Sequence, residues 1–231
     1  MNYLVSATDT DAGKTFVTGT LLAMLGSRGQ RAAGLKPVAS GAVPAADGTP
    51  VSEDASFLLQ MAGLPESFRP HINPYVLGPA LAPDLAAART GVETSPAVME
   101  DAYRKLAAQF DHVLVEGAGG ITTGLAKDYT VIDLTQHLQL PIILVCDNRL
   151  GAINRLLTTV YYCQGHQLTV AAVILNGCDD PQSVLEQSNR RTMEARSGIP
   201  VIGMLPTYNG ELTPAALAAW AGEYLDIDAL F

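Results

Sequence analysis

Residues 2–15 hold the feature that most constrains the fold: a short β-prone run, a small polar loop and the start of a helix. Residues 3–5 form the run, the loop spans residues 8–13, and Lys14 opens a segment in which apolar residues recur at helical spacing. This order gathers loop amides and a helix N-terminus around one point, where an anion binds. The start of the chain is therefore predicted to bind phosphate.

Three residues of this stretch would have separate tasks. Gly13 lets the backbone approach a phosphate, Lys14 brings a positive charge to the β- and γ-phosphates, and Thr15 offers a hydroxyl to a bridging Mg²⁺. A strict G-x-x-x-x-G-K-T motif would have glycine at position 8, where this chain has Thr8. The alternative is a turn glycine followed by two solvated polar residues.

Length and composition predict one α/β domain over residues 1–231. The chain is 48% hydrophobic, which is ample for one large core. A net charge of -9 with no cluster of lysines and arginines argues against nucleic-acid binding. No basic segment precedes an apolar stretch at the start and no apolar run is long enough to span a bilayer, so a cytoplasmic protein without a membrane partner is expected. The three cysteines are odd in number and widely spaced, which predicts reduced core residues.

β-prone and helical segments alternate along the chain, which predicts a mostly parallel sheet with helices on both faces, as in P-loop NTPases. Further strands are expected at residues 30–38, 112–116, 141–145, 168–176 and 200–204. Helices are expected at residues 16–25, 95–109, 132–138, 150–162, 181–196 and 213–224, and irregular segments at residues 42–52 and 64–83.

Polar residues at the expected strand ends are candidates for a site, because parallel strands bring these ends to one edge. Lys36 would reach a substrate there or remain a solvated lysine. Asp54 would be a helix N-cap, a Mg²⁺ ligand or both. Glu116 ends the clearest buried strand, in the place of a carboxylate that orders Mg²⁺, although a strand ending in a flexible turn is the alternative. Asn176 ends a further strand.

Four motifs together carry a resemblance to a known family. They are Thr-Asp-Thr-Asp-Ala-Gly-Lys-Thr at 8–15, Lys-Pro-Val-Ala-Ser-Gly at 36–41, Val-Glu-Gly-Ala-Gly-Gly at 115–120 and Gly-Ala-Ile-Asn at 151–154. With these motifs the chain resembles the dethiobiotin synthetases over nearly its whole length. The first motif alone would suit several P-loop ATPases and amidoligases.

The resemblance implies an ATP- and Mg²⁺-dependent ligase of biotin biosynthesis. In that family one amine of 7,8-diaminononanoate takes up CO₂ to give a carbamate. ATP phosphorylates the carbamate, and the second amine closes the ureido ring with loss of phosphate. The family also implies a homodimer in which the substrate's carboxylate lies across the interface.

The resemblance assigns roles by matching position. Lys14 and Lys36 would be catalytic, and Thr15, Asp54 and Glu116 would hold Mg²⁺. Contacts with ATP would come from Asp11, Ala12, Gly13, Lys14, Thr15, Phe16, Asp54, Glu116, Gly117, Ala118, Gly119, Asn176, Gly177, Thr207, Tyr208 and Asn209. Contacts with the diamine substrate would come from Ser40, Gly119, Leu150, Gly151, Ala152, Ile153 and Asn154.

Three positions depart from the family pattern. Ala7 replaces a glycine, which is tolerable where φ is negative. Arg155 replaces a histidine. Asp84 also replaces a histidine, and it would either cap a helix that starts near Leu85 or face the diamine and alter which diamine fits.

Two rival functions stay open from the sequence. One is a related P-loop ATPase that acts on another diamine or carboxylate. The other is an ATP-driven switch of the ParA/MinD type. Such switches usually carry a second lysine early in the phosphate loop, where this chain has Asp9 and Asp11, and the chain adds Lys36 at the substrate edge.

Overall fold

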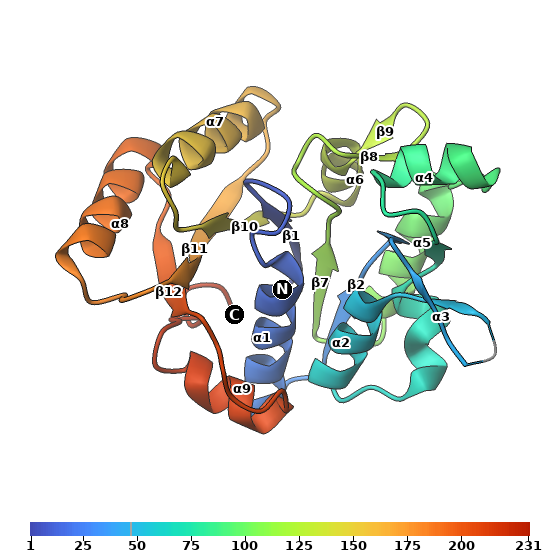
Figure 1. Cartoon of the computed structure of the whole chain (residues 1–231), viewed down its shortest axis with the longest axis horizontal. Coiled ribbons are helices and arrows are strands. Elements are labelled where there is room, and N and C mark those ends of the chain that lie inside the picture. Colours follow the sequence, from blue (N-terminus) through green and yellow to red (C-terminus); the bar gives the residue numbers. More distant parts are fainter. Residues whose placement is uncertain (47) are drawn as a thin grey trace.

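The computed structural model describes residues 1–46 and 48–231, and a parallel sheet of six strands forms its centre (Figure 1). The strand order is β12-β11-β10-β1-β7-β2, and each neighbouring pair is parallel. The strands are β1 (Tyr3–Ala7), β2 (Ala32–Leu35), β7 (His112–Glu116), β10 (Ile142–Asp147), β11 (Val170–Cys178) and β12 (Val201–Pro206). The predicted α/β fold with a mostly parallel sheet is confirmed.

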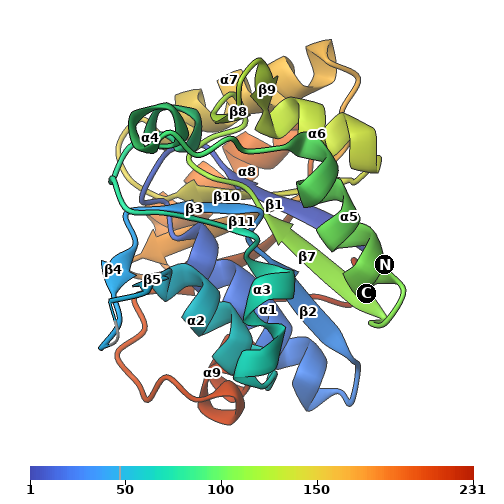
Figure 2. The ribbon, with the colours of Figure 1, turned by 90° about the vertical axis from the view of Figure 1, so that its right-hand side faces the viewer.

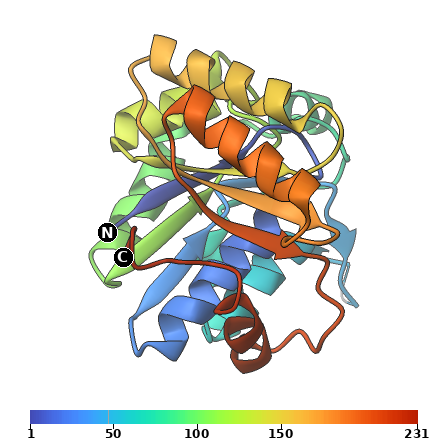
Figure 3. The same cartoon turned by 90° about the vertical axis from the view of Figure 1, so that its left-hand side faces the viewer.

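Helices cover both faces of this sheet (Figures 2 and 3). One layer holds α1 (Lys14–Ser27), α2 (Glu53–Met61) and α9 (Pro214–Ala221). The other holds α5 (Pro96–Ala107), α6 (Val131–Leu138), α7 (Ala152–Gly165) and α8 (Val184–Ser197). The N- and C-termini lie side by side near the start of β1. There the rings of Tyr3 and Phe231 meet edge to face with centroids 5.3 Å apart.

The core explains why the first strand lies at the centre of the sheet. Leu4 and Val5 are fully buried, and β1 pairs with β10 on one side and with β7 on the other. Ala7 is the last residue of β1 and keeps a strand backbone, so the alanine causes no strain there. The loop that follows β1 therefore leaves the middle of the sheet at its carboxyl edge, where ligands bind in parallel α/β sheets.

The expected strand at residues 30–38 was wrong in extent. Its first part is β2, while Val38–Ser40 forms β3, which pairs with β6 (Tyr75–Leu77) in a separate two-stranded sheet. The break falls at Lys36 and Pro37, because proline lacks the amide that would continue the pairing and the Lys36 N–H donates to the Ile72 carbonyl instead.

Two segments expected to be irregular contain structure. Within residues 64–83 lie a 3₁₀ turn (Glu66–Phe68), α3 (Arg69–Ile72) and β6, and α4 (Pro83–Thr90) begins at the end of the segment. Within residues 42–52, β4 (Val43–Pro44) pairs with β5 (Pro50–Val51), and Asp47 lies outside the described residues. β8 (Gly124–Ala126) and β9 (Tyr129–Thr130) form another small pair.

Two predictions from composition can be compared with the structure. Cys146, Cys163 and Cys178 are buried and unbridged, as expected of reduced core residues. Burial raises the pKa of each thiol, to about 11 for Cys146 and Cys163 and about 12 for Cys178. In the described part of the chain, none of the helices has the length and apolar composition needed to cross a membrane.

Candidate active site

A cavity of about 780 Å³ opens at the carboxyl edge of the sheet, beside the loop that follows β1. Its walls come from the phosphate loop, the ends of β2, β3 and β7, the start of α2 and the segment before α4. The lining residues are Thr10, Asp11, Gly13, Lys14, Thr15, Lys36, Val38, Ser40, Asp54, Ala80, Leu81, Ala82, Pro83, Glu116, Ala118, Gly119 and Thr123. Both predicted catalytic lysines, the three predicted metal ligands and two of the seven predicted substrate residues therefore share one cavity.

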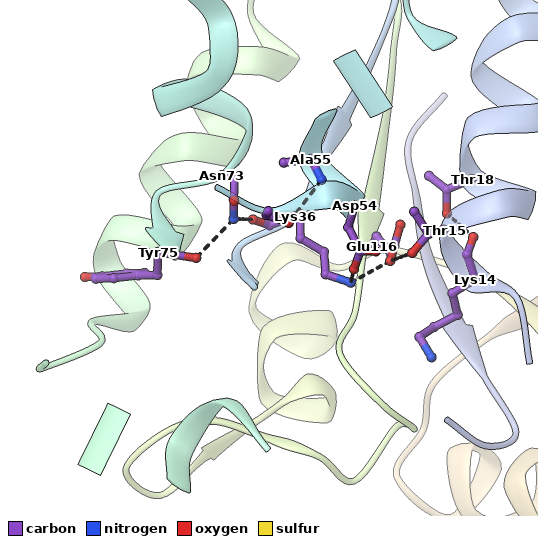
Figure 4. A network of polar contacts seen from close by, with 10 residues as sticks. Lys14, Thr15, Thr18, Lys36, Asp54, Ala55, Asn73, Tyr75 and Glu116 are labelled. Atoms are coloured by element: carbon purple, nitrogen blue, oxygen red, sulfur yellow. Dashed lines mark hydrogen bonds and ion pairs between the residues drawn. The ribbon is translucent and has the colours of Figure 1, made fainter. Parts of the chain in front are cut away.

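Lys36 lies at the centre of an ion-pair network in the wall of this cavity (Figure 4). Its Nζ lies 2.6 Å from Glu116 Oε1 and 2.8 Å from Asp54 Oδ2. The hydroxyl of Thr15 donates to the same Glu116 Oε1 at 2.7 Å. We call Thr15, Lys36, Asp54 and Glu116 the Lys36 network. Lys36 is 5% exposed and Glu116 is fully buried, so Lys36 is not the solvated lysine of the alternative.

The backbone of Lys36 is fixed by residues of the segment 64–83, which was expected to be irregular. The buried Asn73 donates from Nδ2 to the Lys36 carbonyl at 2.8 Å and to the Tyr75 carbonyl at 3.1 Å (Figure 4). The Lys36 N–H donates to the Ile72 carbonyl at 2.7 Å. The backbone of Lys36 is thus bonded to Ile72 and Asn73, and its side chain lines the cavity.

Asp54 was considered as an N-cap, and the structure places it differently. The N-cap of α2 is Ser52, whose hydroxyl accepts the Ala55 N–H. Asp54 lies in the first helical turn, where a carboxylate interacts favourably with the positive end of the helix dipole. Its side chain is therefore available to the cavity, where it pairs with Lys36.

Burial and neighbouring charges shift the pKa of Lys36 and of Asp54 in opposite directions. Burial alone would lower the pKa of Lys36, but Glu116 and Asp54 outweigh it and the net pKa is raised. Burial would raise the pKa of Asp54, yet Lys36 and hydrogen bonding lower it overall. The pKa of Lys14 is lowered, first by burial and then by the positive charge of Lys36. The network is therefore held as a charged ammonium between two carboxylates.

The loop geometry around Gly13 suits an anion. Gly13 has φ 88°, the left-handed region that glycine adopts readily, and it directly precedes α1. Lys14 is largely buried, and it forms no ion pair with the described residues (Figure 4). A buried ammonium beside the amides at a helix start is an arrangement that binds phosphate.

The donor set of the Lys36 network fits Mg²⁺. One hydroxyl and two carboxylates are the hard oxygen ligands that this ion takes in nucleotide sites. Glu116 Oε2 is buried and has no hydrogen-bond partner among the described residues. A buried carboxylate oxygen without a partner is costly, so an additional cation at this position would satisfy a group that the protein alone leaves unpaired.

The residues predicted to contact adenine lie on the other side of the phosphate loop. Asn176 donates from Nδ2 to the Ala12 carbonyl at 3.0 Å, and a Cβ at Gly13 would lie 2.1 Å from that nitrogen. Tyr208, in the segment 207–209 after β12, packs on Phe16 with ring centroids 6.1 Å apart and on Trp220 at 4.7 Å. These residues flank the start of α1, and their contacts with a base stay a prediction.

The start of α7 is separate from the cavity. Among the described residues that line the cavity, none belongs to 150–154. Leu150 is fully exposed, and α7 begins at Ala152 rather than at the expected position 150. Arg155 donates to the Leu150 and Asp147 carbonyls, both at 3.3 Å, and so braces the turn before α7.

Asp84 is neither an N-cap nor part of the cavity wall. Ala82 is the N-cap of α4, and Asp84 lies in the first turn, where its carboxylate accepts the Leu85 N–H at 2.9 Å. The carboxylate faces Gly124 of β8, since a Cβ there would lie 2.3 Å from Asp84 Oδ2. Ala82 and Pro83 line the cavity instead.

The family model described as an AAA domain (AAA_26) matches residues 1–216. The ATP-dependent dethiobiotin synthetase BioD of Bacillus cereus (strain G9842) is 36% identical over 228 residues, which are 99% of this chain and 92% of the relative. The protein of the same name from Bacillus thuringiensis (strain Al Hakam) has the same identity and coverage. The chain belongs to the dethiobiotin synthetase family.

Solved structures of ATPases with low sequence identity have a similar fold. A ParA family ATPase from Chlorobium tepidum TLS has a TM-score of 0.57 at 15% identity, with 95% of this chain and 98% of that chain covered. The cell division ATPase MinD of Pyrococcus furiosus has a TM-score of 0.53 at 15% identity, with 96% and 99% covered. At this identity the likeness concerns the P-loop fold alone, so it does not favour the switch function over the synthetase.

Sequence reasoning missed part of the cavity wall of this synthetase family member. Thr10, Val38, Thr123 and residues 80–83 were not predicted to line it. Thr123 holds the turn after β7, since its hydroxyl accepts the Gly120 N–H at 3.1 Å. A small-residue run before a helix-starting proline, as at 80–83, was the one available signal that a ligand approaches the backbone there.

Proposed function

We propose that this protein is a dethiobiotin synthetase that uses ATP and Mg²⁺ to close a ureido ring on 7,8-diaminononanoate. The observation that carries the proposal is Lys36, a buried ammonium between two carboxylates in the same cavity as the phosphate loop. A protein that only hydrolyses ATP has no need of a second buried lysine on the acceptor side. Family membership supports the same conclusion.

The proposed reaction has three steps. One amine of the diamine attacks CO₂ and loses a proton, which gives a carbamate anion. A carbamate oxygen attacks the γ-phosphorus and the bond to ADP breaks, which gives a carbamic-phosphoric anhydride. The second amine attacks the carbonyl carbon, expels phosphate, loses a proton and closes the ring.

The difficulty of the second step is electrostatic, because an anion attacks a polyanion. Lys14 would hold the β- and γ-phosphates, while Lys36 and Ser40 would hold the carbamate and bring it into line. Both lysines line the cavity. Mg²⁺, held by Thr15, Asp54 and Glu116, would neutralise charge on the phosphates when bound. Lys14, Lys36 and Glu116 are buried, which strengthens their interactions.

The nucleotide would extend from this cavity over the phosphate loop. Asp11, Ala12, Gly13, Thr15 and Phe16 would contact the phosphates and ribose, with Gly117, Ala118 and Gly119 opposite them. Asn176, Gly177 and residues 207–209 would contact adenine. The packing of Trp220 on Tyr208 supports a direct readout, since tryptophan fluorescence would report a base that binds beside Tyr208.

We also propose that the active unit is a homodimer. Leu150, Gly151, Ala152, Ile153 and Asn154 do not line the cavity of their own described chain, while Leu150 is fully exposed. A two-fold partner would bring this turn to the far end of a diamine held by Lys36. Amides at the start of α7 would then bind the substrate's carboxylate.

Phosphate release with each substrate omitted in turn tests the proposed function. We expect release only when ATP, Mg²⁺, diamine and bicarbonate are all present, because the phosphoryl acceptor forms from the last two. Lys127→Met, at an exposed surface lysine, is the matched control for Lys36→Met. Equal ATP hydrolysis without diamine would favour the switch function, and turnover of a different diamine would correct the substrate alone.

A further inference from the structure

Lys36 occupies the position in which the proposed function requires a metal ion. Its ammonium contacts Asp54 and Glu116, and Glu116 Oε1 also accepts the hydroxyl of Thr15. These three residues are the proposed ligands of Mg²⁺. The Lys36 ammonium therefore contacts the carboxylates that the proposed function assigns to Mg²⁺.

Two buried ammonium groups already lie beside the proposed metal ligands. Lys14 and Lys36 supply two positive charges, and Asp11, Asp54 and Glu116 supply three negative ones in the cavity wall. A bare divalent cation would have to enter beside two largely buried ammonium groups, which repel it. A metal ion that arrives bound to a triphosphate comes with the negative charge of the phosphates. That charge offsets the repulsion by the two ammonium groups.

Within the described part of the chain, this arrangement leaves one oxygen of Glu116 without a partner. Glu116 Oε1 has two partners, Lys36 and Thr15, whereas the buried Oε2 has none among the described residues. Ion pairs retained purely for stability satisfy the remaining lone pairs with further donors. The free oxygen leaves a place for a second cation to bind.

We propose that Lys36 is a tethered substitute for Mg²⁺, which keeps Asp54 and Glu116 in ligand positions until the metal enters with the nucleotide. When Mg²⁺ binds Asp54 and Glu116, Lys36 turns away from these carboxylates. Its ammonium then pairs with the substrate anion instead. The carbamate is thus held only after Mg²⁺ and ATP are in place. The identity of that anion depends on the proposed function, but the competition between Lys36 and the metal does not.

Metal binding without substrates tests this competition directly. Free Mn²⁺, counted by electron paramagnetic resonance, is titrated into nucleotide-free wild type, Lys36→Met and Lys127→Met. We expect Lys36→Met to bind Mn²⁺ about tenfold or more tightly than wild type, because one buried repulsive charge is gone and two carboxylates are released. Lys127→Met should match wild type. Equal or weaker binding by Lys36→Met would overturn the proposal.

Stability measurements cover the case in which Lys36→Met folds poorly. Removing Lys36 leaves Glu116 buried and uncompensated, so the variant should melt at a lower temperature, and Mg²⁺ alone should raise that temperature far more than it does for wild type. A Lys36→Met protein that is as insensitive to Mg²⁺ as wild type would contradict the competition.

Wild type supplies a measurement that needs no variant at Lys36. The lysines of the chain are Lys14, Lys36, Lys105 and Lys127, so selective ¹⁵N labelling gives few ammonium signals to assign. Mg²⁺ alone should leave the Lys36 signal in place, and Mg²⁺ with a non-hydrolysable ATP analogue should shift it. An equal shift with Mg²⁺ alone, or none with both, would overturn the proposal. Because no diamine is present, a wrong substrate assignment would not affect these results.

Discussion

The Lys36 network and the turn before α7 differ in every physical respect, although both are proposed to hold the same substrate. Lys36 and Glu116 of the network are buried, Thr15 and Asp54 are half-buried, and the network is built on the ends of β2 and β7 and the starts of α1 and α2. The turn exposes Leu150 completely and offers backbone amides. Under the proposed function, the charged part of the site is assembled within one chain, whereas the far end of the substrate would be bound by an exposed turn that a partner chain covers.

Removal of Lys14 should have the largest effect on this contrast. Lys14→Ala deletes the buried charge that would hold the β- and γ-phosphates, so both ATP affinity and turnover should fall, with kcat/KM lower by roughly a thousandfold. Quenching of Trp220 by ATP and steady-state phosphate release measure the two losses. Unchanged ATP affinity would remove Lys14 from the phosphate site.

Removal of Lys36 should separate chemistry from nucleotide binding. Lys36→Ala should lower kcat by about a hundredfold or more without weakening ATP binding, because Lys36 would hold the carbamate that accepts the phosphoryl group and not the nucleotide. Circular dichroism of the variant controls for the loss of a buried ion pair. Near-normal turnover would place Lys36 outside the chemistry.

A charge at the exposed turn tests the other side of the comparison. Leu150→Asp should raise KM for the diamine by roughly tenfold and leave ATP affinity unchanged, since a carboxylate would repel the substrate's own carboxylate. Leu185→Asp, at another exposed leucine on α8, is the matched control. Analytical ultracentrifugation completes the test: a fully active wild-type monomer at assay concentration would refute the shared site.

Asp84 should give the smallest effect. Its carboxylate accepts the Leu85 N–H and faces Gly124 rather than the cavity, so Asp84→Asn should keep KM for the diamine within about twofold. Asp84→Ala should cost about 0.3–1 kcal/mol of stability, because a charge leaves the first turn of α4. Thermal melts and substrate titrations measure both. A large rise in KM with a shifted pH optimum would mean that Asp84 faces the diamine after all.

Some of the site could be predicted from the sequence because its residues carry local signals. Gly13, Lys14 and Thr15 follow a β-prone run, and Glu116 ends a clearly buried strand. The pairing of Lys36 with Glu116 had no such signal, since it depends on β2 and β7 being neighbours in the sheet. Sequence order separates these residues by 80 positions.

Other features could not be predicted because they depend on tertiary contacts. Asn73 reads as part of a proline-rich irregular segment, and only the approach of α3 to Lys36 makes it a support for the site. The break of the strand at Pro37 follows from a known property of proline, yet the new partner β6 lies in that same irregular segment. Asp84 was noticed as an unusual residue, and only the structure shows that it faces Gly124.

Incorporation of labelled bicarbonate tests the central claim most directly. Wild type is incubated with ATP, Mg²⁺, 7,8-diaminononanoate and ¹³C-bicarbonate, and the product is analysed by mass spectrometry. We expect dethiobiotin with one ¹³C in the ureido carbon and one phosphate released per molecule formed, and about a hundredth or less of this product with Lys36→Ala over the same time. ATP hydrolysis at an undiminished rate without diamine, with no labelled ring compound in the complete mixture, would contradict it.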